Sequence, residues 1–349
     1  MYKLNFCAGP AKLPTHIYST LSQMILNYKG TGLSLLSLSH RDLLFTQVNN
    51  NIKKHLKTLL KLPKNYEILL MPAGASGQFA AIPMNLKQSG KALYLNSGYW
   101  ANVAINEAKK FVDVDVREGI DLNLNKLDAE YDYVHYTDNE TVDGMQWSCI
   151  PLTNMALVCD MSSSFLSKPI NITKYDLIYA GAQKNIGLPG VTVVVIKKKL
   201  IENVADNQIP AVLNYKEMYQ ADSLYNTPDV IAWTAMELVL DDLINLGGLD
   251  IMKHKNAQKA ELLYKEIDKS KIFNNKIVIK NRSKMNVVFQ LPTKNITSKF
   301  LEFTDQHGIY GIAGHRSVGG MRVSLYNAID LVDVEKLISV MHKFEKNII

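Results

Sequence analysis

The chain has 349 residues, of which 47% are hydrophobic and 21% are charged, and its formal net charge is +6. These proportions are typical of a globular protein, argue against long disordered regions and allow more than one compact domain. The positive charge alone would fit a nucleic-acid-binding protein, but the lysines are spread over many segments instead of forming one stripe. We therefore expect small anionic ligands and no nucleic acid.

Apolar residues with helical spacing, at 14–28 and 44–61, predict two amphipathic helices near the N-terminus. Short apolar runs then predict strands, and several are apolar on both faces, as the central strands of a parallel sheet are. These runs are 67–71, 91–95, 111–116, 131–137, 155–160, 176–181 and 191–196. Helix-like segments at 78–87 and 101–110 separate some of them. The alternation predicts an α/β fold with an open, mostly parallel sheet.

A further helix is predicted over 225–248, where Thr227 suits the N-cap, Pro228 the first helical position and Gly247–Gly248 the end. Beyond residue 250 the pattern changes to that of a smaller α+β domain. Its predicted elements are a helix at 251–268, strands at 277–280 and 285–291, a helix at 297–307, a strand at 321–326 and a helix at 331–346.

The cysteines and the hydropathy pattern indicate in which cellular compartment the protein is expected. Cys7, Cys149 and Cys159 have no CxxC spacing and cannot all pair, which favours a reducing compartment. The N-terminal residues lack the uninterrupted apolar segment of a signal peptide. The uncharged stretch 68–86 is long enough to span a membrane, but its glycines, prolines and asparagine fit a strand–loop–helix junction better. We therefore expect a cytoplasmic protein without membrane contact.

In open α/β sheets, ligands bind beyond the carboxyl ends of the strands, and several polar residues are expected there. Gly74–Gln78 follows the first strand and opens a helix, so its backbone amides would suit a phosphate; a tight turn of small residues explains the pattern equally well. Trp100 follows the second strand and would suit stacking on a flat ring, although a tryptophan there is more often part of the core.

Asp160 ends one predicted strand, and Lys184 follows the next strand, 24 residues later. Singly, the aspartate would be interpreted as a loop cap and the lysine as an ordinary surface residue. Together with the amide turn they make the parts of a pyridoxal-phosphate site: an acid for the protonated ring nitrogen, a lysine for a Schiff base and a cradle for the phosphate. A free lysine, with a pKa of about 10.4, needs desolvation before it acts as nucleophile or base.

Two histidine–arginine pairs provide basic groups. His40 and Arg41 lie in SLSHRD, and His315, Arg316 and Arg322 lie in GIAGHRSVGGMR. Surface arginines are ordinarily only solvated, but a planar guanidinium also suits bidentate binding of carboxylate or phosphate. We infer a dianionic substrate. No metal-ligand spacing is present, and we expect no metal.

The sequences around these residues closely resemble those of the phosphoserine aminotransferase family. The matching motifs run in order along essentially the whole chain, and the combination of AGAQKN around Lys184 with GHRSVGGMR at 314–322 is especially specific. The other matching motifs are AGPAKLP at 8–14, SHRD at 39–42, GQFAAIPMNL at 77–86, SGYW at 97–100, NETVDG at 139–144, YNTP at 225–228, KAELLY at 259–264 and NRSKMNVVFQL at 281–291.

The resemblance implies a pyridoxal-phosphate enzyme of fold type I that forms a homodimer with shared active sites. It implies an N-terminal segment, 1–14, that associates with the active site and the small domain; a large cofactor-binding domain, 15–250, with a mostly parallel seven-stranded sheet; and a small C-terminal α+β domain, 251–349. The implied reaction is reversible transamination between L-glutamate and 3-phosphohydroxypyruvate in serine biosynthesis, giving 2-oxoglutarate and O-phospho-L-serine. Some bacterial members also form 4-phosphohydroxy-L-threonine in pyridoxine biosynthesis, and no residue named here decides whether this chain does.

The resemblance also implies roles for single residues. Lys184 would form the Schiff base and move the proton, Asp160 would bind the pyridine nitrogen and Trp100 would stack on the ring. The remaining cofactor contacts would come from the backbone amides of Ala75 and Ser76, the side chains of Thr141 and Gln183, and Asn226 and Thr227 of the partner subunit. The two anionic ends of the substrate would be held by His40, Arg41, His315, Arg316 and Arg322.

One position departs from the family pattern, and three alternatives remain. Some relatives carry an arginine where this chain has Ser76, and the loss of that cation would weaken phosphate binding. A cysteine desulfurase of the same fold type needs a reactive thiolate, and Cys149 has no cationic activator in its surrounding sequence, QWSCIPL. A nucleic-acid-binding protein would leave Asp160 and Lys184 without a role. A catalytically inactive dimeric scaffold is opposed by the presence of every expected site residue apart from the variable position.

Overall fold

The computed structural model describes residues 3–119, 124, 130–204 and 208–348. Its largest sheet has seven strands, and β10 runs antiparallel to both of its neighbours while the other six strands run in one direction. From edge to edge, the strands are β2 (Tyr66–Pro72), β10 (Val191–Lys197), β9 (Leu177–Gly181), β8 (Leu157–Asp160), β5 (Tyr133–Thr137), β3 (Lys91–Asn96) and β4 (Asp113–Glu118). Each overlaps one of the predicted runs, so the predicted mostly parallel seven-stranded sheet is confirmed.

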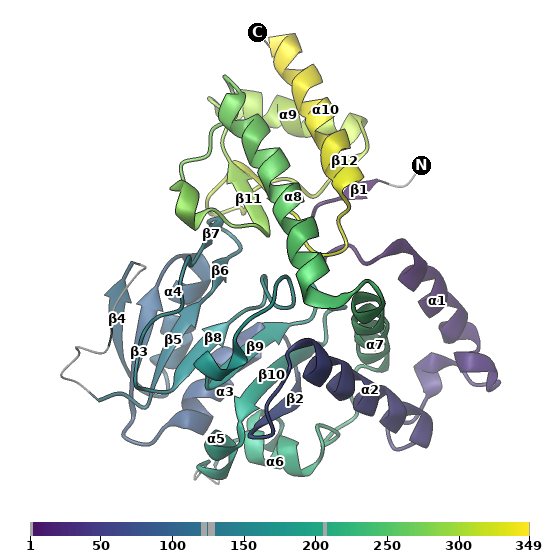
Figure 1. Ribbon diagram of the computed structural model, residues 1–349, viewed down its shortest axis with the longest axis vertical. Coiled ribbons are helices and arrows are strands. Elements are labelled where there is room, and N and C mark those ends of the chain that lie inside the picture. The colour runs from purple at the N-terminus through teal and green to yellow at the C-terminus, as the bar shows by residue number, and fades with distance from the viewer. Residues whose placement is uncertain (1–2, 120–123, 125–129, 205–207, 349) are drawn as a thin grey trace.

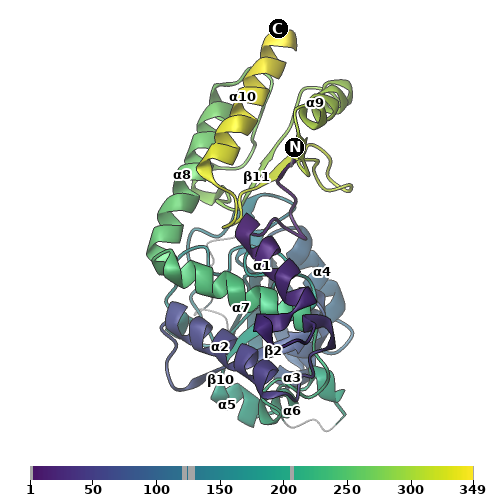
Figure 2. The ribbon, with the colours of Figure 1, turned by 90° about the vertical axis from the view of Figure 1, so that its right-hand side faces the viewer.

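Helices cover both faces of this sheet, because alternate strand residues point to opposite sides and both sides are apolar. Ile68 and Leu70 belong to the core that includes α1 (Thr15–Leu26), α2 (Leu43–Leu59) and α7 (Val230–Asn245). Leu69 and Met71 belong to the core on the opposite face, with α3 (Ala75–Leu86), α4 (Tyr99–Ala108), α5 (Lys198–Glu202) and α6 (Tyr215–Gln220). Figure 2 shows α1, α2 and α7 gathered on one side of the molecule.

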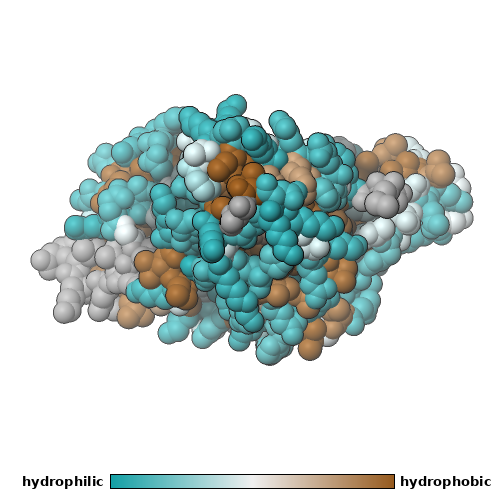
Figure 3. All heavy atoms as spheres, turned by 90° about the horizontal axis from the view of Figure 1, so that it is seen from above, coloured by the Kyte–Doolittle hydropathy of each residue, from teal (hydrophilic) through white to brown (hydrophobic). Residues whose placement is uncertain are grey.

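A second group of elements lies beyond the sheet and has its own hydrophobic core (Figure 1). It contains α8 (Gly248–Lys269), α9 (Lys294–Gln306), α10 (Leu331–Ile348) and an antiparallel pair, β11 (Asn286–Phe289) and β13 (Met321–Ser324). From the N-terminal segment, β1 (Leu4–Asn5) pairs in parallel with β12 (Ile309–Tyr310), and Phe6 enters this second core. Viewed from this end, the surface is mainly hydrophilic, with separate hydrophobic patches (Figure 3).

The predicted strand at 277–280 is wrong, because these residues form a loop that leads into a single 3₁₀ turn, η6 (Ile279–Asn281). Val278 and Ile279 are 65% and 77% exposed, so the apolar run is not buried against a sheet. The side chain of Asn275 donates to the carbonyl of Val288 on β11 at 2.6 Å. A side chain therefore occupies an acceptor that a neighbouring strand would have needed.

The predicted helix at 225–248 is α7, but it begins at Val230, and its N-cap is Asp229 instead of Thr227. The Asp229 carboxylate accepts the N–H of Ala232 at 2.9 Å. Proline disfavours a helical conformation in the residue before it, so Pro228 keeps Thr227 outside the helix. At the other end, the predicted glycine pair joins two helices, because α8 begins at Gly248.

The uncharged stretch 68–86 forms most of β2, a turn and α3, as the sequence predicts. Across the described ranges, no helix combines the length and apolar character needed to cross a bilayer. Residues 1, 2, 120–123, 125–129, 205–207 and 349, which fall within the expected segment and domains, lie outside the described residues.

Candidate active site

A pocket lies where β2, β5, β8 and β9 end, because the carboxyl ends of parallel strands meet at one edge of the sheet. The cofactor residues predicted for a single chain all line it: Ala75, Ser76, Trp100, Thr141, Asp160, Gln183 and Lys184. Gly74, Phe79, Thr137, Asn139, Ser162 and Ser163 complete the lining. The fold thus gathers residues separated by more than a hundred positions in the sequence.

Lys184 lies in the turn after β9 and is half-buried. Its Nζ donates to the Thr141 hydroxyl at 2.8 Å and lies 5.9 Å from the centroid of the Trp100 ring. Burial lowers the pKa of Lys184 to about 8, although the negative charges of Asp160 and Glu140 oppose this effect. With a pKa of about 8, roughly a tenth of the amine is neutral at pH 7, and this fraction is able to act as a nucleophile or base.

Asp160 is the last residue of β8, and 5% of its surface is exposed. Burial raises its pKa, and the positive charge of Lys184 is the largest effect that opposes the rise. Its Oδ1 accepts the backbone N–H of Ser162 at 2.8 Å. The site therefore holds an acid and a base in one desolvated space, each favouring the charged form of the other.

The turn between β2 and α3 has the properties of a phosphate cradle. The N-cap of α3 is Gly74, which has no side chain to accept the first amides of the helix. The N–H of Gly77 already donates to the Gly74 carbonyl at 2.9 Å. The amides of Ala75 and Ser76 therefore start a helix whose N-terminus faces the pocket lining without a side-chain cap, an arrangement that suits an anion.

Glu140 was not predicted from the sequence, yet it fixes the helix that carries Trp100. The two oxygens of its buried carboxylate accept the N–H of Trp100 at 2.9 Å and the N–H of Ala101 at 3.0 Å. Asp143 accepts the N–H of Tyr99 at 2.9 Å. These acidic side chains replace the missing cap at Gly98 and complement the positive end of the helix dipole.

Burial raises the pKa of Glu140 to about 7, although the two amide donors stabilise its ionised form. A Cβ atom on Gly98 would lie 2.6 Å from an Asp143 oxygen and 2.8 Å from the Glu140 Cγ, so only glycine fits there. The one signal in the sequence was the position of Glu140 beside Thr141 in NETVDG.

Two buried polar atoms around the pocket have no hydrogen-bond partner among the described residues: the Thr137 hydroxyl and the Trp100 indole nitrogen. Thr137 ends β5 and pairs in register with Asp160 on β8. Buried polar groups without a partner are rare in proteins. Their presence here indicates that a polar ligand belongs in the pocket.

The structure brings two of the predicted basic residues close to this pocket. Arg322, on β13, is near enough for its positive charge to lower the pKa of Lys184. Its Nε is buried and has no hydrogen-bond partner within the described ranges. The His315 ring centroid lies 4.8 Å from that of Tyr99, which precedes Trp100 on α4.

The other predicted residues lie elsewhere on this single chain. Arg41, Arg316, Asn226 and Thr227 are exposed, and His40 is half-buried. His40 and Arg41 precede α2, and Asn226 and Thr227 precede α7. As far as the described residues go, none of the five lines the pocket.

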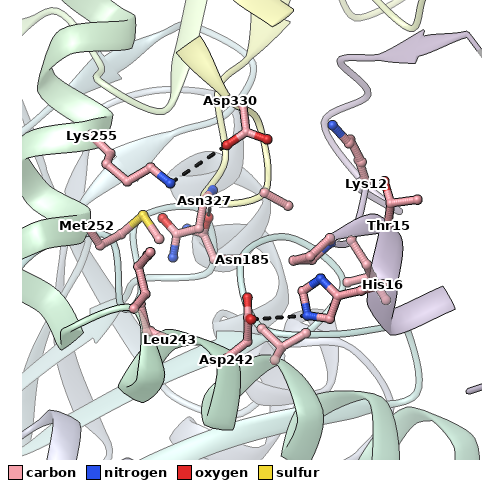
Figure 4. Close-up of a pocket in the computed structure, with 15 residues that line it drawn as sticks. Lys12, Thr15, His16, Asn185, Asp242, Leu243, Met252, Lys255, Asn327 and Asp330 are labelled. Carbon is pink, nitrogen blue, oxygen red and sulfur yellow. Dashed lines mark hydrogen bonds and ion pairs between the residues drawn. The ribbon is translucent and has the colours of Figure 1, made fainter. Parts of the chain in front are cut away.

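A second, larger cavity of about 350 Å³ is lined by Asn185, the residue after Lys184 (Figure 4). The N-terminal segment, α7 and α8 contribute to its walls. His16 Nε2 lies 3.1 Å from Asp242 Oδ1, and Lys255 Nζ lies 3.7 Å from Asp330 Oδ1. These four side chains are thus paired with each other, and Lys12 pairs with Asp333. Among the described residues no predicted site residue lines this cavity, so the pocket around Lys184 remains the candidate active site.

Comparison with known proteins gives a consistent picture. The family Aminotransferase class-V matches residues 3–337. A phosphoserine aminotransferase of Acinetobacter baumannii (strain ACICU) is 42% identical over 357 residues, covering 99% of both chains. Among solved structures, phosphoserine aminotransferase from Bacillus circulans subsp. alkalophilus has a TM-score of 0.93 and 36% identity, covering 98% of both chains. PLP-bound phosphoserine aminotransferase from Trichomonas vaginalis has a TM-score of 0.92 and 33% identity, covering 97% of this chain and 99% of the other.

Proposed function

This chain belongs to the class-V aminotransferases and, within them, to the phosphoserine aminotransferase family, and we propose that it catalyses the reversible transfer of an amino group from L-glutamate to 3-phosphohydroxypyruvate. The products are 2-oxoglutarate and O-phospho-L-serine, the latter a precursor of serine. The observation that carries the proposal is the position of Lys184: its amine has one hydrogen bond among the described residues, and it shares with Asp160 a pocket that is also lined by the N-terminus of α3.

The cofactor of the proposed reaction is pyridoxal 5'-phosphate, and the residues present fit it. The uncapped N-terminus of α3 suits its phosphate, Asp160 suits its ring nitrogen and Lys184 suits its aldehyde. The unpartnered Thr137 hydroxyl supplies a further polar contact. When bound, the cofactor supplies a ring that accepts the electrons left on the α-carbon of the amino acid.

Each residue of the pocket has a task that follows from its surroundings. Lys184 binds the cofactor through Nζ and later moves a proton at the α-carbon of the substrate, which requires the neutral amine that burial favours. Asp160 holds a proton on the ring nitrogen by its negative charge. Trp100 contacts the ring face, and Glu140 fixes the position of its backbone. Thr141 accepts a hydrogen bond from Lys184 and orients its amine.

The substrates carry an anion at each end, and basic side chains would bind both ends. Arg322, whose buried Nε has no partner among the described residues, and His315, whose ring lies beside Tyr99, would bind these anionic ends. The amides of Ala75 and Ser76, with the Gln183 side chain, would hold the cofactor phosphate. Keeping the two phosphate-binding tasks on different elements lets one pocket hold cofactor and substrate together.

The enzyme is proposed to act as a homodimer with shared active sites. Asn226 of the partner subunit and Thr227 of the partner subunit would complete the cofactor phosphate site, and Arg41 would reach the substrate together with His40 and Arg316. On a single chain Arg41 is exposed beside Leu43, which is 84% exposed. An exposed leucine next to unused basic groups supports a surface that another copy covers.

Three further assignments complete the proposal. A domain boundary near residue 250 separates a large domain, 15–250, from a small one, 251–349, which is supported by the separate hydrophobic core of the second group of elements. We place the enzyme in the cytoplasm, where its three cysteine thiols would remain reduced. A cysteine desulfurase is disfavoured, because the exposed Cys149 does not line the Lys184 pocket in the described part of the chain.

The test is an absorption spectrum of the purified, cofactor-loaded protein before and after addition of O-phospho-L-serine alone. We expect the visible band of the lysine-bound cofactor to disappear with phosphoserine and to persist with alanine. A yellow protein whose spectrum does not change with phosphoserine would support the proposed cofactor and refute the proposed substrate. A protein that stays colourless after incubation with pyridoxal 5'-phosphate would refute the cofactor and the role of Lys184.

A further inference from the structure

Two buried residues without an assigned task, His135 and Tyr179, lie directly beneath the pocket. The His135 Nε2 lies 2.9 Å from the Tyr179 hydroxyl. The strand register sets Tyr179 beside Asp160, and the Tyr179 hydroxyl is near enough to the Asp160 carboxylate to lower the pKa of that carboxyl. His135 is 1% exposed and Tyr179 is fully buried. The three side chains form a continuous chain from the sheet interior to the pocket floor.

The sheet register explains why these side chains meet. Asp160 on β8 and Tyr179 on β9 are directly paired. His135 on β5 is paired with Val158, which lies two residues before Asp160 and so on the same face of the sheet. On the other side, the Tyr94 ring stacks on the His135 ring, with centroids 4.6 Å apart and planes at 23°. The imidazole is therefore clamped between two tyrosines.

The direction of the hydrogen bonds follows from the number of available hydrogens. Burial lowers the pKa of His135 to about 3, so the ring is neutral and carries one N–H. If this N–H is on Nε2, it donates to the Tyr179 oxygen, and the single Tyr179 hydrogen is free to donate to Asp160. The other tautomer would place the hydrogen on Nδ1, which has no partner among the described residues, and would draw the Tyr179 hydrogen away from Asp160.

We propose that His135 and Tyr179 are positioning residues for Asp160: His135 donates to Tyr179, and Tyr179 donates to Asp160, so that the carboxylate stays ionised and faces the cofactor's ring nitrogen in one orientation. The proposal rests on the proposed function for the identity of that nitrogen. Its hydrogen-bond part concerns only residues of this chain and can be tested without the cofactor.

Several groups affect the ionisation of the Asp160 carboxyl, and the contribution of the two proposed positioning residues differs from that of the others. Lys184, from the turn after β9, stabilises the carboxylate by its charge, and the Ser162 amide by a hydrogen bond. Glu140, from β6 (Asn139–Glu140), is an acidic neighbour that repels it. The charge on Lys184 would change during the reaction cycle, because its amine would serve as a nucleophile and then as a base. Tyr179 keeps its hydroxyl donor throughout the cycle, so it would stabilise the Asp160 carboxylate at every step.

The experiment is a pH titration of the Asp160 carboxyl by carbon-13 NMR in the full-length, cofactor-free protein labelled at aspartate, with Asp160→Asn identifying the resonance. Tyr179→Phe keeps the buried ring and removes the donor. We expect its titration midpoint to rise by about one pH unit, a tenfold change in the ionisation equilibrium, because a hydrogen bond to a charged group contributes about that much. The matched control is Tyr133→Phe, which removes a hydroxyl bonded to Tyr94 on the same face of the sheet.

The role of His135 as a hydrogen-bond donor is tested by one variant that removes the donor and one that keeps it. His135→Leu removes the donor to Tyr179 and should raise the Asp160 midpoint by less than Tyr179→Phe does, whereas His135→Gln keeps an amide donor and should restore it. In the loaded enzyme, kcat should fall for Tyr179→Phe with KM unchanged. Equal midpoints in Tyr179→Phe and Tyr133→Phe would overturn the proposal. Failure of the wild-type protein to bind the cofactor would refute the proposed function but leave the titration result standing.

Discussion

Lys259 and Lys184 both carry an ammonium group into the interior of the protein, in two different regions. Lys259, on α8, is 1% exposed, and its Nζ donates to the carbonyl oxygens of Leu325, Tyr326 and Ile329 at 3.1, 2.9 and 2.8 Å. An ammonium group has three hydrogens, so each of them has an acceptor. This lysine closes the loop between β13 and α10 and has no capacity left for another partner.

Lys184 also carries its amine into a desolvated space, but it has fewer hydrogen-bond partners than Lys259. It is half-buried at an open pocket, and within the described ranges its Nζ has a single hydrogen bond, to Thr141. Burial lowers the pKa of both lysines, so a lowered pKa does not distinguish a reactive lysine from a structural one. The number of satisfied hydrogens and the access from a pocket do distinguish them.

The largest expected effect is that of Lys184→Ala, which should abolish turnover. Loss of proton transfer alone costs about 10²- to 10⁴-fold in rate, and loss of the covalent attachment adds to it. Stability should change little, because the amine has few partners to lose. Steady-state kinetics and thermal unfolding on one preparation would check both statements. Retained turnover in a folded Lys184→Ala protein would show that the lysine is not the reactive one.

The reciprocal change, Lys259→Met, should act on stability and not on catalysis. Methionine has a similar length but no donor, so the buried carbonyls of Leu325 and Ile329 lose the Lys259 donor, while that of Tyr326 keeps a backbone N–H. We expect a loss of about 3 kcal/mol in the free energy of unfolding, measured by urea denaturation, since each unsatisfied buried group costs about 1–3 kcal/mol. The kcat of the folded enzyme should stay the same. A lower kcat at unchanged stability would show that Lys259 takes part in catalysis and would contradict its assignment as a structural lysine.

Asp160→Asn should reduce kcat while the cofactor still binds. Asparagine keeps the shape of the side chain but has no charge to hold a proton on the ring nitrogen. Loss of one charge-assisted hydrogen bond corresponds to a decrease of roughly 10- to 100-fold. Cofactor content, read from the absorption spectrum, separates this effect from loss of binding. An unchanged rate would mean that Asp160 is not the partner of the ring nitrogen.

The smallest expected effect is on the pH dependence of the rate at which Lys184 captures the cofactor. Only a neutral amine attacks the aldehyde, and a lysine with its pKa lowered to about 8 becomes neutral as the pH rises through that value. The capture rate should therefore rise with a midpoint near pH 8 and level only above that value. The negative charge of Asp160 raises the pKa of Lys184, so the midpoint should move to lower pH in Asp160→Asn. Stopped-flow absorbance, with Lys184→Ala as the blank, measures it; a midpoint near that of free lysine would refute the lowered pKa.

Much of the fold was predictable because local patterns determine it. Seven apolar runs matched seven strands, and the residues that follow those strands, Asp160 and Lys184, came together as expected for an open α/β sheet. The run at 277–280 misled the prediction, because β-forming residues there are exposed and the edge of β11 is occupied by the Asn275 side chain. Local sequence does not reveal which apolar residues stay in solvent.

The second half of the site could not be predicted, because it depends on contacts between distant segments. Glu140 caps a helix that begins about forty residues earlier, and nothing near either segment indicates the pairing. His135 and Tyr179 reach Asp160 only through the register of three strands. Arg41 and Asn226 do not line the pocket in the described part of a single chain, and their proposed roles depend on a second copy of the chain.

The most direct test of the contrast between the two lysines is to reduce the cofactor-loaded protein with borohydride and map the modified peptide by mass spectrometry. We expect the mass of the reduced cofactor on Lys184 and no label on Lys259. Label on Lys259, or on any lysine other than Lys184, would contradict this expectation.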